Sequence, residues 1–286
     1  MAREGASGAI VISGASTGIG RACAIRMAEK GFDVFAGVRR PEDGESLRAE
    51  APERILPVIL DVTDQKTIEA TAATVGEAVG EAGVAGLVNN AGITVQGPVE
   101  FTPLDELRRQ LEVNVVGQVA LTQALLPQIR TARGRIVNVT SVGGRVAHAF
   151  LAPYNASKYA MEAITDALRR ELKPWGIHVA AIEPGSIKTE IWRKGEETAD
   201  DLLEQLGPEG QELYGEPLQN VRKFARRLGE RGDPPEAVAD RIEHALTARR
   251  PRTRYLIGRE AKAQVALTAM LPDRAFDKIE ARALGL

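Results

Sequence analysis

The stretch Ala9-Ile10-Val11-Ile12-Ser13-Gly14-Ala15-Ser16-Thr17-Gly18-Ile19-Gly20 decides the fold of this chain. Its first four residues are apolar and predict a short buried strand. A turn with three glycines follows, and from Ile19 the apolar residues recur at helical spacing as far as Ala28. A strand, a tight turn and a helix in this order are the opening unit of an α/β fold.

The same alternation of short strands and longer helices continues along the chain. Strands are expected at residues 34–38, 55–60, 86–88, 135–139, 177–182 and 254–257. Helices are expected at residues 63–82, with Thr63 as the cap, 104–129 and 154–173. Because the strands are apolar without alternation, the sequence predicts a doubly wound parallel α/β sheet covered by helices on both faces. Pro57 indicates that 55–60 is an edge strand or starts late.

A charged segment interrupts this single domain, residues 1–286, before its last helix and strand. Residues 190–232 are expected to form a helical insertion, either a mobile lid over a lipophilic pocket or a helix with a permanently packed face. Its apolar positions are Leu202, Leu203, Leu206, Leu213, Tyr214, Leu218 and Phe224. Asp233 is expected to cap the next helix. Residues 260–286 form a helical tail that Pro272 interrupts.

Composition and charge exclude several classes of protein. The 286 residues carry a net charge of −2, without the basic excess that nucleic-acid binding needs. The single cysteine, Cys23, rules out an internal disulfide framework and a cysteine-rich metal site. His148, His178 and His244 match no ligand spacing, so we expect no metal, although His148 could contact a substrate. No apolar run is long enough for a signal peptide or a membrane span, so we expect a cytoplasmic protein without a membrane anchor.

The glycine turn is a candidate nucleotide site. A dinucleotide pyrophosphate needs a tight turn, close approach of the backbone and a helix N-terminus that faces its charge. The spacing Gly-x-x-x-Gly-x-Gly after the first strand offers all three, and a turn without a ligand is the alternative. The residues expected to contact the cofactor here are Gly14, Ser16, Thr17, Gly18, Ile19 and Gly20.

The end of the second strand indicates which dinucleotide binds. An acidic residue there would hydrogen-bond the ribose of NAD, but Val38 takes that position and Arg39 and Arg40 follow. Guanidinium groups match a 2′-phosphate, so the sequence favours NADP over NAD. The alternative is that both arginines are only solvated loop residues.

Two further strand ends offer cofactor contacts, because ligands in folds of this kind bind at the carboxyl ends of the strands. Asp61 and Val62 follow the third strand, where Asp61 could hold the adenine edge, cap a helix, or do both. Residues 89–92 end the fourth strand and could line the cofactor or only shape the turn. The candidates among them are Asn90, Ala91 and Gly92.

Tyr154 and Lys158 form the candidate catalytic pair. At positions i and i+4 of a helix they lie on one face, one turn apart. A phenol is a poor base at neutral pH, but a neighbouring ammonium and an oxidised nicotinamide would both favour the phenolate. Ser141, at the end of the strand 135–139, could orient a substrate oxygen at the same site.

The chain resembles the short-chain dehydrogenase/reductase family over nearly its whole length. The matching features are residues 14–20, 61–62 and 89–92, Asn114, Ser141, Tyr154, Lys158, Pro184 and Gly185. The resemblance implies a Rossmann fold with Tyr154 as the general acid/base. It implies that Lys158 binds the nicotinamide ribose and lowers the tyrosine pKa, and that Ser141 polarises the carbonyl. Asn114, otherwise a polar residue inside a helix, would hold a proton-relay water.

Residues 182–189 and 251–274 are similar to the retinol dehydrogenase and 17β-hydroxysteroid dehydrogenase group. This similarity implies further cofactor contacts at Pro184, Gly185, Ile187 and Thr189. The family also implies a homo-oligomer, a dimer or a tetramer, that pairs through the helices at 104–129 and 155–173. The positions expected at that interface, unless they only face the sheet, are Ala120, Leu121, Ala124, Leu125, Ala163, Ala167 and Leu168.

Together these features predict an NADP(H)-dependent oxidoreductase. Hydride would pass between the nicotinamide and a carbonyl or secondary alcohol carbon of a lipophilic, steroid- or retinoid-like substrate. Tyr154 would protonate the oxygen while Ser141 stabilises its charge. A non-catalytic dinucleotide-sensing protein is the alternative, and the complete set of Ser141, Tyr154 and Lys158 argues against it. A sugar-nucleotide epimerase or dehydratase fits the glycine spacing less well.

Overall fold

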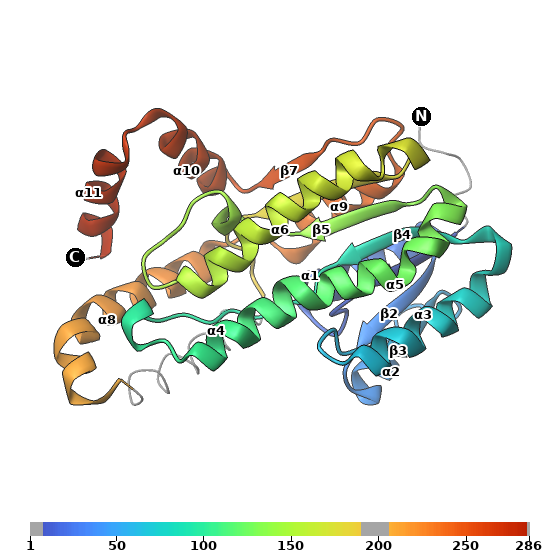
Figure 1. The fold of residues 1–286 in the computed structure, drawn as a ribbon, viewed down its shortest axis with the longest axis horizontal. Helices are drawn as coiled ribbons and strands as arrows, with labels where there is room; N and C mark the ends of the chain where they lie inside the picture. Colours follow the sequence, from blue (N-terminus) through green and yellow to red (C-terminus); the bar gives the residue numbers. More distant parts are fainter. Residues whose placement is uncertain (1–7, 190–205, 285–286) are drawn as a thin grey trace.

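The strands form one parallel sheet. They are β1 (Ala9–Ile12), β2 (Asp33–Val38), β3 (Ile55–Ile59), β4 (Val84–Asn89), β5 (Arg135–Val139), β6 (His178–Pro184) and β7 (Arg254–Ile257). In the computed structural model, which describes residues 8–189 and 206–284, these seven strands have the order β3-β2-β1-β4-β5-β6-β7. Every neighbouring pair is parallel and the order reverses between β1 and β4, so the predicted doubly wound α/β fold is confirmed (Figure 1). Pro57 lies in the edge strand β3, as its sequence indicated.

Helices cover both faces of the sheet. They are α1 (Gly18–Glu29), α2 (Pro41–Arg48), α3 (Gln65–Val79), α4 (Leu104–Leu111), α5 (Gly117–Ala132), α6 (Ala152–Glu171), α8 (Gly207–Arg231), α9 (Pro235–Thr247), α10 (Arg259–Met270) and α11 (Asp273–Leu284). A π-helical turn, η3 (Glu112–Val116), joins α4 to α5. A 3-10 turn, η4 (Val142–Gly144), follows β5. Among the described residues, no helix is both long and apolar enough to cross a bilayer.

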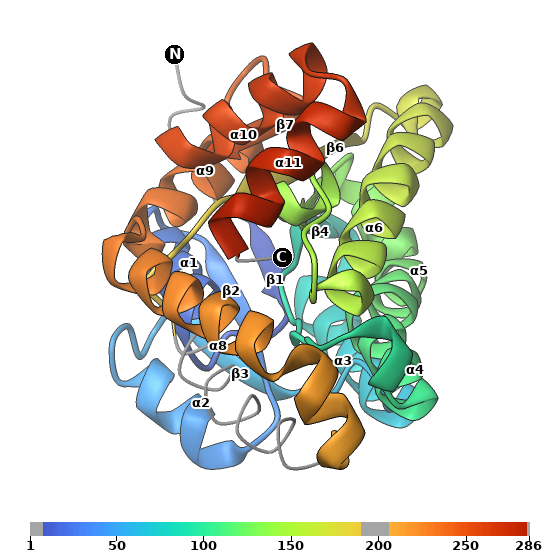
Figure 2. The same cartoon turned by 90° about the vertical axis from the view of Figure 1, so that its left-hand side faces the viewer.

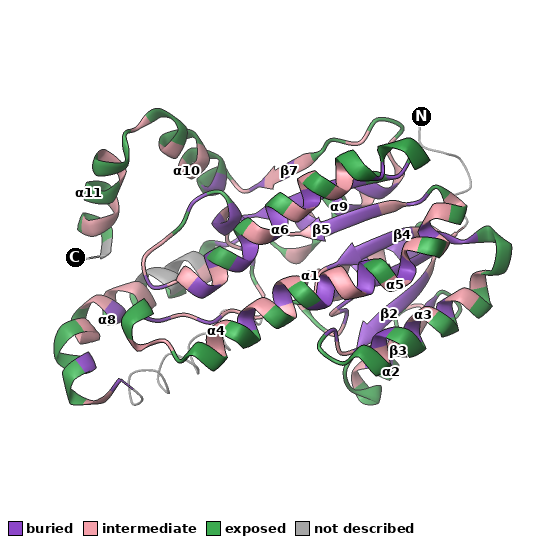
Figure 3. Cartoon of the chain, in the orientation of Figure 1, coloured by how far each residue is buried: buried purple, intermediate pink, exposed green. Residues whose placement is uncertain are grey.

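The strand β1 shows why these strands read as unbroken apolar runs. Ile10 and Ile12 belong to a core that includes residues of α1 and α9, whereas Val11 belongs to a second core with α3 and α5. Alternate side chains therefore enter two different cores, and neither face of the strand meets water. Figure 3 shows the same division, with buried strands and helices exposed on their outer sides.

Two predicted helix caps were wrong. Asp64, not Thr63, caps α3, because its carboxylate accepts a hydrogen bond from the Lys66 N–H at 3.0 Å. Asp233 does not cap α9, which has Pro234 in the cap position and no side-chain capping bond. The main-chain carbonyl of Asp233 instead accepts a hydrogen bond from the Lys188 N–H at 2.9 Å.

The helix expected at 104–129 is interrupted by η3, and α5 runs on to Ala132. The sequence analysis also missed α2, a short charged helix that begins at Pro41. Of the positions expected at a subunit interface, Leu121 and Leu125 are fully buried against the sheet and cannot contribute. Ala163 and Ala167 are exposed on α6, and the other three positions are partly buried.

The charged insertion and the tail lie at the carboxyl edge of the sheet, where α8, α10 and α11 surround the strand ends (Figure 2). Its described part, from Leu206, is one helix, α8, and the predicted positions Leu202 and Leu203 lie outside the described residues. The side chain of Phe224 is likewise outside them. The tail breaks at Pro272 as predicted, between α10 and α11.

Candidate active site

The carboxyl edge of the sheet brings together most of the residues predicted from the sequence. Six consecutive strands of the sheet end at a predicted contact or within two residues of one, and the carboxyl ends of parallel strands lie at one edge. From β1 to β6 these residues are Gly14, Arg39, Asp61, Asn90, Ser141 and Pro184. The reversal of strand order between β1 and β4 places Gly14 and Asn90 at the crevice where ligands bind in such sheets.

The glycine turn leaves no room for side chains at its key positions. A Cβ on Gly20 would lie 2.2 Å from the carbonyl oxygen of Gly14, and one on Gly14 would lie 2.8 Å from the Cα of Ala91. Gly14 and Gly18 also have φ values of +64° and +56°, which glycine adopts without strain. The turn is therefore tight and packs by backbone contact on Ala91, just after β4, which fits the tight, side-chain-free turn of a dinucleotide site.

Ser13 and Asn90 fix this arrangement, and the sequence analysis missed Ser13. The buried Ser13 hydroxyl accepts hydrogen bonds from the N–H groups of Asn90 and Ala91, at 2.9 and 3.0 Å. The Asn90 amide donates to the carbonyls of Ser13 and Gly14, both at 3.0 Å. The Asn90 side chain thus shapes the turn. The signal for Ser13 in the sequence was its small hydroxyl side chain directly after β1.

The first turn of α1 is open to an anion. Its N-cap residue Thr17 makes no side-chain capping hydrogen bond, so the first N–H groups of the helix have no side-chain acceptor there. Ser16 is partly buried and Thr17 is exposed beside it. These residues fit a dinucleotide pyrophosphate, which would take the place of the missing cap.

The two arginines after β2 differ in their surroundings. Arg40 is bound to Asp43 by hydrogen bonds of 3.0 and 3.1 Å, which raise the pKa of its guanidinium. Arg39 is exposed and, within the described part of the chain, makes no hydrogen bond or ion pair. Arg39 is therefore the arginine that is free to meet a 2′-phosphate.

The remaining cofactor candidates lie at the same edge with different orientations. The Asp61 carboxylate accepts hydrogen bonds from the Thr63 N–H and hydroxyl, at 2.9 and 2.7 Å, and closes a turn instead of capping α3. The Val62 and Ile187 side chains are buried in the two cores, so both residues can offer only main-chain groups to a ligand. Thr189 packs against the glycine turn, since a Cβ on Gly18 would lie 3.1 Å from its methyl group.

Ser141, Tyr154 and Lys158 come together as predicted. The Ser141 hydroxyl lies at the end of β5, accepts a hydrogen bond from the Gly143 N–H at 3.0 Å, and is hydrogen-bonded to the Tyr154 hydroxyl. The Lys158 ammonium donates to the Val139 carbonyl at 3.0 Å and lies 5.6 Å from the centre of the Tyr154 ring. One hydroxyl pair and one buried cation therefore face the same point.

Burial dominates the ionisation of the catalytic pair. It raises the pKa of the partly exposed Tyr154 phenol above its ordinary value, and the hydrogen bond with Ser141 opposes that rise. Burial also lowers the pKa of Lys158 to about 8, against the attraction of the Glu162 carboxylate. The lysine thus remains cationic at neutral pH by a narrow margin, and the phenol starts as a proton donor.

Asn114 is buried in η3, and its side chain makes hydrogen bonds within the protein. Its amide oxygen accepts from the Ile93 N–H at 2.9 Å, and its NH₂ group donates to the Ile93 carbonyl and to the Ser157 hydroxyl, both at 3.1 Å. Gln110, one turn earlier, binds the same segment, because its side-chain oxygen accepts a hydrogen bond from the Val95 N–H at 2.6 Å. The sequence analysis missed Gln110, whose signal was a polar residue four positions before Asn114 on a buried face.

An apolar cluster joins the loop before α6 to the helix α8. Phe150, four residues before Tyr154, packs with Leu206 and Leu218 of the insertion. The rings of Phe101 and Phe150 lie 5.9 and 6.1 Å from that of Tyr214 on α8. Phe150 has a φ of +64°, a strained conformation that a hydrogen bond of 2.7 Å from the Gly97 N–H to its carbonyl helps to hold.

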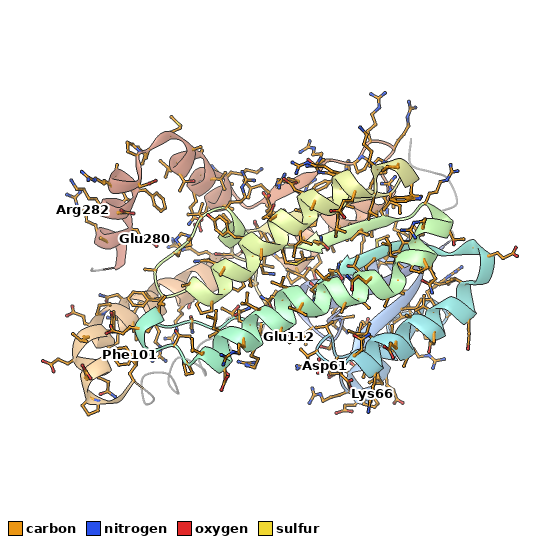
Figure 4. The ribbon with its side chains drawn as sticks, viewed as in Figure 1. Asp61, Lys66, Phe101, Glu112, Glu280 and Arg282 are labelled. Carbon is orange, nitrogen blue, oxygen red and sulfur yellow. The ribbon has the colours of Figure 1, made fainter. Side chains whose placement is uncertain are left out.

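His148 is directed to the tail. Its Nδ1 atom lies 3.1 Å from the Glu280 carboxylate of α11, which also accepts from the Ala149 N–H at 3.1 Å. Figure 4 labels Glu280 on α11 and, below it in this view, Phe101. The tail is thus attached to the loop that leads into α6. Within the described residues, no group of three or more His, Cys, Asp or Glu side chains could hold a metal ion.

Comparisons with known proteins agree with this geometry. The family model for the short chain dehydrogenase matches residues 8–200. The chain is 36% identical to an NADPH-dependent 3-dehydrocapnine reductase from Ornithobacterium rhinotracheale, over 94% of both chains. It is 40% identical to retinol dehydrogenase 5 from Mus musculus, over 94% of this chain and 86% of that one.

A solved structure, a short chain dehydrogenase from Burkholderia cenocepacia in complex with NADP, superposes with a TM-score of 0.72 at 25% identity, covering 97% of this chain and 98% of that one. By its sequence and its fold, this chain belongs to the short chain dehydrogenase family.

Proposed function

We propose that this protein is an NADP(H)-dependent oxidoreductase that interconverts a carbonyl and a secondary alcohol on a lipophilic substrate. The observation that carries the proposal is the meeting of the Ser141 and Tyr154 hydroxyls beside the buried Lys158 ammonium, at the sheet edge that holds the glycine turn. Bound NADP(H) supplies or accepts the hydride at its nicotinamide.

The chain's own groups would handle the oxygen and its proton. In the reducing direction Tyr154 protonates the developing alkoxide, and its raised pKa fits it to hold that proton at neutral pH. Ser141, fixed by the Gly143 N–H, hydrogen-bonds the substrate oxygen and stabilises its charge. Lys158 supplies the positive charge that favours the phenolate once the proton has left.

NADP is favoured over NAD by the free Arg39 at the end of β2 and by the absence of an acid at Val38. Two relatives support this choice, because one is named as an NADPH-dependent reductase and another was solved in complex with NADP. The cofactor contacts at the glycine turn, at Asp61 and at residues 184–189 are part of the same proposal.

The apolar cluster supports a lipophilic substrate. Phe101, Phe150 and Tyr214 form an aromatic cluster in which Phe150 precedes Tyr154 by four residues, and a relative is named as a retinol dehydrogenase. We propose that the insertion covers the bound substrate through α8. The packing of Leu206 and Leu218 on Phe150 supports a permanently packed face for this helix.

We also propose an oligomeric state and a location for the protein. Pairing into a homodimer would use the exposed face of α6 at Ala163 and Ala167 and the half-exposed Val116 of η3. Light scattering at micromolar protein tests it, and a monomeric mass would count against pairing. A cytoplasmic location is proposed from the sequence alone.

The test of the function is turnover by the purified protein. NADPH oxidation is followed by absorbance with a series of aliphatic, retinoid-like and steroid-like ketones, and NADH is run in parallel. The proposal expects oxidation that depends on the ketone and prefers NADPH. Binding of NADPH without turnover of any ketone would favour the alternative, a dinucleotide-sensing protein on the same fold.

A further inference from the structure

Behind the catalytic pair lies a cluster of charged side chains that the proposed chemistry does not use. It consists of two buried carboxylates, Glu162 on α6 and Glu183 on β6, with Arg254 on β7 and the exposed Arg145 directly after η4, and we call it the ion network. Nε of Arg254 lies 3.0 Å from Glu162 and 3.1 Å from Glu183. Nη1 of Arg145 lies 3.1 Å from the same oxygen of Glu183.

The network touches the parts of the chain that carry the reaction. Glu162 follows Lys158 by one turn of α6, on the same face, and both are buried. Gly144 packs on both residues, since a Cβ there would lie 2.9 Å from the Lys158 carbonyl and 3.1 Å from the Cγ atom of Glu162. Arg145 therefore extends the turn that begins at Ser141, and Glu183 precedes Pro184, whose carbonyl lies 3.5 Å from the Ser141 hydroxyl.

Stability alone does not account for these charges. Removing two carboxylates from water costs several kcal/mol per ion, and apolar residues of similar volume are often as stable as a buried ion pair. Burial first, and the charge of Glu162 second, raise the pKa of Glu183. Within the described part of the chain, Oε1 of Glu162 is buried without a hydrogen-bond partner, which leaves negative charge available to its neighbours.

The neighbour that responds is Lys158. The titratable groups that face it are Tyr154, one turn earlier, and Glu162, one turn later. Glu162 is itself faced by Arg254 from β7 and, through the shared guanidinium, by Glu183 from β6. Burial has already lowered the pKa of Lys158 to about 8, so a further fall would leave the amine neutral near physiological pH.

We propose that Glu162 is a positioning residue that keeps Lys158 in its cationic form, and that Arg254 pairs with the Glu162 carboxylate and holds it in place for that task. The inference rests on the proposed function, because that function gives the lysine charge its purpose. An isolated buried carboxylate would take up a proton and lose its effect. In this network Glu162 is not isolated, because the guanidinium of Arg254 donates a hydrogen bond to its other oxygen, Oε2.

The test reads the lysine directly in the cofactor-free protein. The ¹³Cε resonances of labelled lysines are titrated by NMR, and Lys158→Met assigns the resonance of Lys158. The wild type is expected to titrate with a midpoint of about 8. Glu162→Gln, which keeps the shape and removes the charge, is expected to lower the midpoint by about one pH unit.

A matched control is available one turn farther along α6. Asp166 also binds Arg254, at 3.0 Å, but it is more exposed and lies two turns from Lys158. Asp166→Asn should therefore leave the Lys158 midpoint unchanged. An unchanged midpoint in Glu162→Gln, or an equal shift in both variants, would overturn the proposal.

A second variant decides the matter if Glu162→Gln does not fold. Arg254→Gln removes the cation that pairs with Glu162, so the carboxylate should lose its effect and the Lys158 midpoint should fall, as in Glu162→Gln. An unchanged or raised midpoint would contradict the proposal. Because the titration needs no turnover, its outcome is separable from that of the ketone assay. A shifted midpoint in a protein that reduces no ketone would contradict the proposed function and leave the assignment of Glu162 standing.

Discussion

The turn after β1 and the buried face of α6 differ in the groups that form them. The turn is made of neutral groups, whereas the face of α6 carries buried charges. The turn is built from backbone, with Gly14 and Gly20 in contact and the neutral side chains of Ser13 and Asn90 holding it. Among the described residues, the buried charged side chains are Lys158, Glu162 and Glu183, and all three lie on the catalytic side.

The difference shows what each region is sensitive to. A site made of backbone groups is disrupted by a substitution that adds side-chain volume. Its groups are neutral, so a change of pH has little effect on it. A site made of buried charges is more sensitive to changes of ionisation than to changes of shape, because each charge shifts the pKa of its neighbours. The predictions below separate the two regions by these criteria.

The largest expected effect is on the catalytic side. Tyr154→Phe should reduce the turnover rate by about three decades, because the ring stays and only the transferable proton is lost. NADPH affinity, measured by fluorescence titration, should be unchanged, as should the thermal unfolding midpoint. Turnover near that of the wild type would remove Tyr154 from the mechanism.

On the nucleotide side the largest effect should come from added volume. Gly20→Ala places a methyl group 2.2 Å from the Gly14 carbonyl and 2.5 Å from the Asn90 amide nitrogen. We expect a loss of about 3 kcal/mol in the free energy of unfolding, the upper end of the usual range for overpacking, together with weaker NADPH binding. Denaturant unfolding measures the first quantity and fluorescence titration the second.

Gly215, on α8, provides the matched control, because a Cβ there meets nothing within 4 Å. Gly215→Ala should stabilise the protein by about 0.5–1 kcal/mol, the difference between these residues inside a helix. Equal effects of the two substitutions would mean that the contact between the glycine turn and β4 does not limit the site.

The sequence was sufficient to predict the fold and the meeting of Ser141, Tyr154 and Lys158 at one site, and insufficient where long-range contacts decide the structure. Apolar runs and the glycine turn predict strands and a site through local rules, so β1 and its turn were placed correctly. The ends of α3 and α9 were wrong because a neighbouring Asp64, and a tertiary contact of Asp233 with Lys188, outweighed the local capping preference.

Residues 162 and 183 show the limit most clearly. In the sequence they are ordinary acids, one in an amphipathic helix and one at the end of an apolar strand. Only the pairing of β6 with β7 brings Arg254 between them. Arg39 and Arg40 look equivalent in the sequence, and only the helix α2, which carries Asp43, separates the bound arginine from the free one.

That separation yields the next prediction. Arg39→Ala should cost about 1.5–3 kcal/mol in NADPH binding, the range for hydrogen bonds to charged groups, and little in NADH binding. Arg40→Ala should have a smaller effect on NADPH, because its guanidinium is already bound to Asp43. Isothermal titration of both cofactors against both variants measures this, and equal losses for NADPH and NADH would refute the role of Arg39.

The smallest effect expected is a change of NADPH affinity with pH, and it tests the comparison from the catalytic side. The pKa of Lys158 is lowered to about 8, so its ammonium is present below pH 8 and is lost as the pH rises through that value. If Lys158 donates hydrogen bonds to the nicotinamide ribose, the affinity should fall above pH 8, by at most about tenfold per pH unit because one proton is involved. Fluorescence titration of NADPH between about pH 7 and 9.5 gives the profile, and Lys158→Met should bind more weakly with a flat profile in that range. A flat profile in the wild type, or the same slope in Lys158→Met, would mean that the affinity for the cofactor is set by the backbone turn and Arg39 alone.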